Sequence, residues 1–232
     1  TYALKSYANY KAQILESQMG GLLLKINENE VWVRLIGTFN AYNLLAIYGT
    51  AVELGLDYFE VLRLLSELES VSGRFQYIIS NEKITAIVDY AHTPDALENV
   101  LKTINDIRTK NEQLITIVGC GGDRDKAKRP IMANIASAMS DKTIITSDNP
   151  RTEKPEDIIA DMEQGVEPQN FKKTMSITDR KQAIQAACQM AQPNDIILIA
   201  GKGHETYQEI QGVRYDFDDM KIVKELLIQL NK

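Results

Sequence analysis

From Phe75 to its last residue, the chain alternates short apolar segments rich in β-branched residues with longer amphipathic segments. The apolar segments are expected to form strands, at 84–88, 114–118, 143–146, 175–177 and 196–200. The longer segments have helical periodicity, near 95–107, 130–139, 156–163, 180–191 and 219–230. Strands that alternate with helices in this way predict an α/β fold, with a mostly parallel sheet and helices on both faces.

Residues 1–72 follow a different pattern. Apolar and polar residues alternate over 22–26 and 31–35, on either side of a polar turn, which predicts a hairpin. Two helices are expected next, at about 40–54 and 58–68. These strands have no obvious partners, so residues 1–72 are expected to be part of a domain and residues 73–232 a complete one.

Composition excludes several classes of protein. The chain carries 26 basic and 32 acidic side chains, a net charge of -6, which disfavours nonspecific binding to nucleic acid. Its two cysteines, Cys120 and Cys188, form no disulfide framework, and neither has zinc-site spacing to a histidine. No apolar run reaches the roughly 20 residues of a membrane span. These features predict a cytoplasmic protein with no membrane segment and no metal site.

The polar residues best suited to binding a ligand or to catalysis follow the ends of predicted strands. They form four loops, at 89–94, 119–124, 147–151 and 201–205. The carboxyl ends of parallel strands lie at one edge of a sheet, where such folds place their ligand loops. Both histidines of the chain, His92 and His204, lie in these loops. The pattern predicts a single binding face.

Each loop also has an ordinary structural explanation. Asp89 and Thr93 would cap the helix that follows them. The glycines within 119–122 and 201–203 would allow a positive φ in a turn, and residues 148–150 would form another turn. Turn chemistry alone does not settle which explanation holds for any one loop.

Three charged side chains in these loops are harder to explain as turn residues. They are Arg124, Arg151 and Glu205. Guanidinium groups bind carboxylates, and a carboxylate binds an ammonium group. Together they predict a site for a zwitterion such as an amino acid.

Two nucleotide-binding motifs are incomplete. Residues 119–122 follow a strand, but Arg124 stands where the dinucleotide pattern G-x-G-x-x-G needs its last glycine, so an NAD-dependent dehydrogenase is disfavoured. The phosphate loop G-x-x-x-x-G-K-[ST] is absent, because residues 201–204 lack its spacing and its hydroxyl residue. A triphosphate cradle, if the protein uses ATP, is expected outside this chain.

Six motifs in order resemble those of the Mur ligases, and within them the MurE branch, the UDP-N-acetylmuramoyl-tripeptide synthetases of the meso-diaminopimelate-adding type. They are GTFNAYNLLA (37–46), SGRF (72–75), VDYAHTPDAL (88–97), GCGGDRDKAKRP (119–130), SDNPRTEKP (147–155) and AGKGHETYQ (200–208). The resemblance implies that residues 1–72 are the end of a central ATP-binding domain. It implies that residues 73–232 are the C-terminal, Rossmann-like domain that binds the incoming amino acid.

The resemblance also implies an activity, which is ATP-dependent amide formation through an acyl phosphate in peptidoglycan synthesis. The substrates would be ATP, UDP-N-acetylmuramoyl-L-alanyl-D-glutamate and meso-diaminopimelate, with Mg²⁺ as metal cofactor. The family's phosphate loop, magnesium ligands and carbamylated lysine have no counterpart here. The chain alone is therefore expected to hold no catalytic residue and not to catalyse, and the protein is expected to be a monomer.

The family's binding residues carry over to two sets of positions in this chain. The nucleotide set comprises Asn43 near adenine, Arg74 at the phosphates, Asp89 at the ribose and His92 in the same loop. The diaminopimelate set comprises Arg124, Asp148, Asn149, Pro150, Arg151, Gly201 and Glu205. Lysine-adding members usually depart from the final Arg of D-N-P-R. Lysine has no distal carboxylate, so an Arg here favours diaminopimelate.

Three other functions remain to be separated from this one. The nearest are an L-lysine-adding member of the same branch and a folylpolyglutamate-type ligase, which is also ATP-dependent. The third is a noncatalytic domain that only binds a small molecule. The Gly-rich loop at 119–124 and the D-N-P-R string at 148–151 disfavour the folylpolyglutamate-type ligase.

Overall fold

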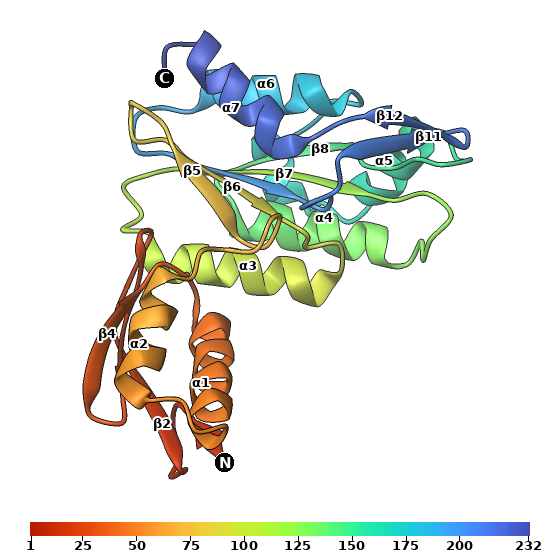
Figure 1. The fold of residues 1–232 in the computed structure, drawn as a ribbon. Helices are drawn as coiled ribbons and strands as arrows, with labels where there is room; N and C mark the ends of the chain where they lie inside the picture. Colours follow the sequence, from red (N-terminus) through yellow and green to blue (C-terminus); the bar gives the residue numbers. More distant parts are fainter. The chain divides into compact units, whose positions relative to one another are not determined.

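The computed structural model describes residues 1–232, and the chain forms two compact units. The first comprises residues 1–70 with 106–108, and the second comprises 71–105 with 109–232. The sequence predicted the boundary after residue 72, two residues further along. Figure 1 shows the course of the chain through both units.

The second unit contains a six-stranded sheet with the order β5-β6-β10-β7-β8-β9. Five of its strands are parallel: β6 (Thr85–Asp89), β10 (Ile196–Ala200), β7 (Leu114–Cys120), β8 (Lys142–Ser147) and β9 (Thr174–Ser176). The helices are α3 (Pro94–Ile107), α4 (Lys128–Met139), α5 (Pro155–Glu163), α6 (Arg180–Met190) and α7 (Asp219–Gln229). The predicted α/β fold is confirmed.

The central strands are buried on both faces, which explains their continuous apolar sequences. Every residue of β10 is buried, as in the strands of parallel sheets that carry helices on both sides. Figure 1 shows α6 and α7 on one side of the sheet and α3 and α4 on the other. Ile117 and Ile199 pack with Ile184 of α6 and Leu227 of α7 in one apolar cluster. The helices thereby hold the strand ends, and the loops after them, in place.

Four elements of this unit were not predicted. They are β5 (Gln76–Ile79), the 3₁₀ helix η1 (Pro168–Lys173), and a hairpin of β11 (Tyr207–Ile210) and β12 (Val213–Asp216). β5 pairs antiparallel with β6 at the edge of the sheet. All four residues of β12 are exposed, and the alternation of Val213 and Tyr215 with charged residues is too short to predict a strand.

The first unit is a four-stranded sheet covered by two helices. Its strands are β1 (Tyr2–Ala3), β2 (Tyr10–Gln18), β3 (Gly21–Ile26) and β4 (Asn29–Val33), in that order, with α1 (Thr38–Glu53) and α2 (Tyr58–Glu67). The predicted hairpin is confirmed as β3 and β4. The expectation that these strands lack partners is wrong, because β2 pairs antiparallel with β3 across the turn before Gly21.

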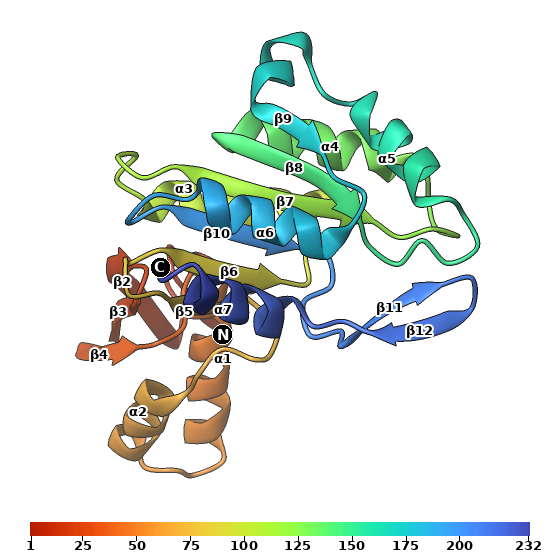
Figure 2. The ribbon, with the colours of Figure 1, turned by 90° about the horizontal axis from the view of Figure 1, so that it is seen from above.

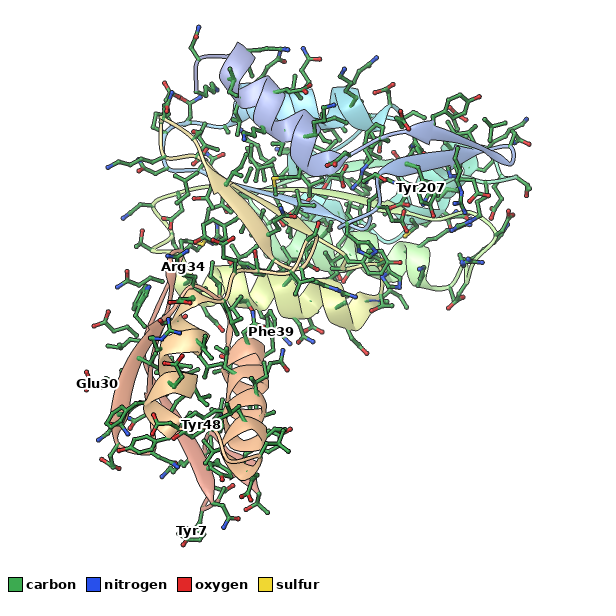
Figure 3. All side chains as sticks on the ribbon, in the orientation of Figure 1. Tyr7, Glu30, Arg34, Phe39, Tyr48 and Tyr207 are labelled. Atoms are coloured by element: carbon green, nitrogen blue, oxygen red, sulfur yellow. The ribbon has the colours of Figure 1, made fainter.

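This unit has an apolar core of its own. Leu24 and Leu45 are fully buried, and the ring of Tyr48 packs edge-to-face against Tyr10 with centroids 5.8 Å apart. Figure 3 shows Tyr48 among the helices and strands of this unit. None of the chain's helices has both the length and the apolar character that crossing a bilayer requires.

Candidate functional site

A cavity of about 640 Å³ lies in the second unit, where the loops after four parallel strands meet. Figure 2 shows these strands running in the same direction, so that their carboxyl ends share one edge of the sheet. The cavity is lined by Tyr90, His92, Thr93, Pro94, Gly119, Cys120, Gly121, Arg124, Asp125, Ala127, Lys128, Ile131, Asp148, Asn149, Arg151, Gly201 and Glu205. Six of the seven residues predicted for an amino acid are among them. Pro150 does not line it.

Two guanidinium groups face the cavity from neighbouring loops. Nη1 of Arg151 donates to the carbonyl of Gly122 at 2.8 Å, and Nη2 has no hydrogen-bond partner within the protein. Arg124 is exposed, and its one hydrogen bond joins Nη1 to the carbonyl of Asp123 at 3.3 Å. Neither guanidinium forms a close ion pair, since Nε of Arg151 lies 3.9 Å from Glu209. Both therefore keep free N–H groups for an anionic ligand.

The acidic side of the cavity is built around Glu205. Its Oε2 accepts from Nδ2 of Asn149 at 2.7 Å and from Nζ of Lys202 at 3.2 Å. Its Oε1 has no hydrogen-bond partner in the protein, while the side chain lines the cavity. Asp148 adds a second carboxylate, and its Oδ1 accepts from the backbone N–H of Asn149 at 2.6 Å. Carboxylate oxygens of this kind bind an ammonium group.

The two loops that carry the arginines are locked against each other. The backbone N–H of Gly122 donates to the carbonyl of Asn149 at 2.9 Å. Both side-chain oxygens of Asp123 accept from Thr152, one from its hydroxyl at 2.7 Å and one from its N–H at 3.2 Å. A Cβ on Gly122 would lie 2.0 Å from the carbonyl oxygen of Pro150. Only glycine allows this approach.

The prediction that the loop glycines allow a positive φ is confirmed in the 201–203 loop and is wrong in the 119–122 loop. Gly201 and Gly203 have φ values of 120° and 53°, as predicted for a turn. No glycine within 119–122 has a positive φ, so that explanation is wrong. Gly119 and Gly122 are required by close packing against the backbone of the 146–150 segment, whereas a Cβ on Gly121 would meet the Arg151 side chain at 2.8 Å.

Two fully buried arginines form ion pairs with residues of the loops and helices around the cavity. Arg129 is fully buried and binds Glu153 and Asp161 through hydrogen bonds of 2.8–3.0 Å. Arg129 and the N–H of Asp123 lower the pKa of Glu153 to about 2. Arg180 forms a fully buried pair with Asp219, and its Nη2 also donates to the last carbonyl of β10 at 3.1 Å. Removing one partner of such a pair leaves a buried charge uncompensated and is strongly destabilising.

The β11–β12 hairpin braces the D-N-P-R loop, which the sequence did not predict. Nε2 of Gln208 donates to the carbonyl of Asp148 at 2.6 Å, and the N–H of Glu209 donates to Oδ1 of Asn149 at 2.9 Å. Arg151 has a φ of 52°, and its N–H donates to the carbonyl of Glu209 at 3.0 Å. The pairing joins residues about 60 positions apart, so no local pattern could reveal it.

The four residues predicted to bind the nucleotide differ in their exposure: one lines the cavity, one is buried and two are exposed. His92 lines the cavity, and its Nδ1 bonds to the carbonyl of Tyr90 at 2.8 Å, which requires the proton on Nδ1. Arg74 is exposed, with its guanidinium 4.9 Å from the centre of the Tyr90 ring. Asp89 is buried and accepts from the N–H of Phe75 at 2.6 Å. Asn43 is exposed on α1 of the first unit.

The capping explanation is confirmed for Thr93 and is wrong for Asp89. The Thr93 hydroxyl accepts from the N–H of Ala96 at 3.3 Å in the first turn of α3, whereas Asp89 binds Phe75. Burial raises the pKa of the Asp89 carboxyl above its usual value. Burial also raises the pKa of the Cys120 thiol to about 12, so this thiol stays protonated near neutral pH and is a poor nucleophile. No three His, Cys, Asp or Glu side chains in residues 1–232 form a cluster that could hold a metal ion.

Comparisons with known proteins identify the family. The family model described as "Mur ligase, glutamate ligase domain" matches residues 73–203. The chain belongs to the Mur ligase family, as its motifs predicted. A curated relative from Cytophaga hutchinsonii, a UDP-N-acetylmuramoyl-L-alanyl-D-glutamate--2,6-diaminopimelate ligase, is 56% identical over 232 residues, covering 100% of this chain and 48% of that protein.

Further relatives and solved structures agree with this assignment. A ligase of the same name from Bacteroides thetaiotaomicron is 54% identical, covering 97% of this chain and 47% of that protein. The chain thus spans about half the length of the curated relatives it matches. A solved structure of a ligase of that name has a TM-score of 0.74 and 40% identity, covering 100% of this chain and 48% of the other. A folylpolyglutamate synthase from Thermotoga maritima shares the fold alone, with a TM-score of 0.63 at 16% identity and coverage of 83% and 44%.

Proposed function

We propose that the complete protein is an ATP-dependent ligase that adds meso-diaminopimelate to UDP-N-acetylmuramoyl-L-alanyl-D-glutamate, through an acyl phosphate, in peptidoglycan synthesis. The names of the relatives that are 54–56% identical support this substrate pair. The observation that carries the proposal is the charge arrangement of the cavity. Two guanidinium groups with free N–H groups and a carboxylate with a free oxygen face one space, and they are complementary to an amino-acid end group.

Diaminopimelate has a carboxylate and an ammonium at each end, and one end must be recognised while the other reacts. We assign the distal carboxylate to Arg124 and Arg151, and the distal ammonium to Glu205. Asp148, Asn149 and Gly201 belong to the same site, and Pro150 supports the loop through its contact with Gly122. Lysine lacks the distal carboxylate and would leave both guanidinium groups without an anionic group from the ligand, which disfavours it.

The cavity's role in the reaction is to place the attacking amine. A rigid pocket that fixes the distal end of the amino acid holds the reacting amine at one distance from the acyl group, which lowers the entropy lost in the transition state. The loops that form this pocket are anchored by the buried Arg129 and Arg180 pairs. Held in this way, the pocket is well suited to positioning.

For ATP, we propose contacts at Asn43, Arg74, Asp89 and His92. Arg74 suits a phosphate contact, since its guanidinium is exposed and pairs with no carboxylate. Asp89 is less available to a ribose, because it is only 7% exposed and one oxygen already binds Phe75. We propose that Mg²⁺ and the phosphate loop are held by a part of the ATP-binding domain outside this chain, of which residues 1–72 are the end. We propose that the reaction takes place in the cytoplasm, where ATP is available. We also propose that the complete protein is a monomer.

The test is turnover by the complete protein. It would be supplied with Mg-ATP and UDP-N-acetylmuramoyl-L-alanyl-D-glutamate, and with either meso-diaminopimelate or L-lysine, while phosphate release and the mass of the product are measured. We expect a tripeptide product with diaminopimelate and little with lysine. Preference for lysine would identify a lysine-adding ligase. Glutamate addition to a folate would identify a folylpolyglutamate-type ligase, and ligand binding without turnover would identify a binding domain.

A further inference from the structure

Lys202 is fully buried, which is rare for a lysine unless its charge is paired. Its neighbours Gly201 and Gly203 both have a positive φ, and this backbone path carries the Lys202 side chain into the protein instead of into solvent. The side chain ends beneath the acidic side of the cavity. Lys202 is not one of the seven residues predicted to bind the amino acid, and it does not line the cavity.

The ammonium group of Lys202 has two polar partners and both belong to the site. Nζ donates to Oδ1 of Asn149 at 3.0 Å and to Oε2 of Glu205 at 3.2 Å. The ring of Tyr207 adds a face contact, with its centre 5.6 Å from Nζ. A buried ammonium that binds only site residues orients those residues and excludes other rotamers.

The contact with Asn149 settles which way its amide points. Oδ1 of Asn149 receives Nζ of Lys202 and the N–H of Glu209, and both of these groups can only donate. The nitrogen Nδ2 must then lie on the other side, where it donates to Glu205 at 2.7 Å. Lys202 thus acts on Glu205 both directly and through Asn149.

We propose that Lys202 is a positioning residue of the amino-acid site: its buried ammonium holds one oxygen of Glu205, so that the other oxygen is presented to the ligand's distal ammonium. This inference rests on the proposed function. Oε2 of Glu205 is occupied by Lys202 and Asn149, while Oε1 has no protein partner. Without Lys202, Oε2 keeps a single amide donor, and the carboxylate is free to rotate away from the ligand.

A comparison of two substrates isolates this effect. 2-Aminopimelate retains both carboxylates and the reacting amine of diaminopimelate but lacks the distal ammonium. The complete protein should use it roughly 100-fold less efficiently in kcat/KM than diaminopimelate, because Glu205 loses its partner. In Lys202→Met, this ratio should fall below about 5, since a misplaced Glu205 no longer distinguishes the two substrates. The KM values for ATP and for the UDP-linked dipeptide should stay within about threefold of the parent values.

Lys232→Met is the matched control. Its ammonium also binds inside the fold, to the carbonyls of Cys188, Gln189 and Ala191 at 2.6–3.2 Å, but it does not line the cavity. It should lower the melting temperature and leave the ratio between the two substrates unchanged. If Lys202→Met lowers kcat/KM equally for both substrates, Lys202 has only a structural role and the proposal is wrong.

A second variant covers the case in which Lys202→Met does not fold. The double variant Lys202→Met/Glu205→Gln removes both charges together, and it should show the same substrate ratio as Glu205→Gln alone. A ratio that differs by more than about threefold would mean that Lys202 acts independently of Glu205, and would overturn the proposal. Failure of the unaltered complete protein to use diaminopimelate at all would refute the proposed function itself, and this inference with it.

Discussion

Arg151→Asn in the complete protein is expected to lower kcat/KM for meso-diaminopimelate while leaving the fold intact. The structure explains why the backbone should tolerate this change. Arg151 has a φ of 52°, a region that asparagine adopts more readily than arginine. The variant loses the 2.8 Å hydrogen bond to Gly122, which contributes about 1 kcal/mol. The melting temperature should therefore fall by no more than about 4 °C.

The loss of activity should be much larger than the loss of stability. The Arg151 side chain is 21% exposed, so its contact with a carboxylate is mostly but not wholly shielded from water. Removing one partner of a shielded charge pair costs about 2–5 kcal/mol, and the partial exposure favours the lower part of that range, about 2–3 kcal/mol. This corresponds to about a 30- to 160-fold loss in kcat/KM. Residual activity with L-lysine should change little, because lysine has no distal carboxylate.

Steady-state kinetics with both amino acids provides the assay, and Lys110→Asn is a matched control. Lys110 is an exposed cation, also at a positive φ of 69°, that does not line the cavity. The Lys110→Asn variant should leave kcat/KM for both amino acids unchanged. Equal losses with diaminopimelate and lysine in Arg151→Asn would show that Arg151 only supports its loop. No loss with either would remove the D-N-P-R loop from the site.

Three further predictions follow from the loops around the cavity. Glu153→Gln should lower the free energy of unfolding by about 2–4 kcal/mol at pH 7, because the fully buried Arg129 loses one of its two carboxylate partners. The pKa of Glu153 is lowered from 4.5 to about 2, so the stability it contributes is present above about pH 4.5 and is lost as the pH falls towards 2. Urea titrations at several pH values should show that the free energy of unfolding depends less on pH in this variant than in the unaltered protein. Glu225→Gln, at an exposed position, is the control. Gly122→Ala should lower stability by about 1–3 kcal/mol and kcat/KM for diaminopimelate by at least about 100-fold, since its Cβ would lie 2.0 Å from a carbonyl oxygen; Gly20→Ala, with no atom closer than 4.0 Å, should do neither. Calorimetry with Mg-ATP should show that the 232-residue chain binds nucleotide much more weakly than about 1 µM, and submicromolar binding would reveal an unrecognised phosphate site.

Local sequence patterns predicted the elements that position the site, because a buried strand or helix face requires apolar residues at a regular spacing. The run at 196–200 is apolar throughout, and in the structure β10 is buried on both faces. The loops after such strands could be placed at one edge without knowledge of their contacts. Six residues assigned to the amino acid then meet in one cavity, since they follow strands that are neighbours in the sheet.

The features that escaped prediction depend on contacts between distant residues. The strands of the hairpin at 207–216 have only four residues each, and its support of Arg151 is a backbone pairing across about 60 positions. A lysine is normally expected at the surface, so the burial of Lys202 could not be inferred from its type. Gly122 was explained by turn geometry, whereas its true constraint is the carbonyl oxygen of Pro150 from another loop.

The most direct test of the account is an NMR titration of the 232-residue chain, with its amide groups labelled with ¹⁵N. Added meso-diaminopimelate should shift the amide signals of three loops, 119–124, 148–152 and 201–205. L-Lysine at the same concentration should shift them far less, and Arg151→Asn should abolish the difference between the two amino acids. Equal shifts with both ligands in the unaltered chain, or shifts confined to residues outside these loops, would contradict the assignment of the cavity to diaminopimelate.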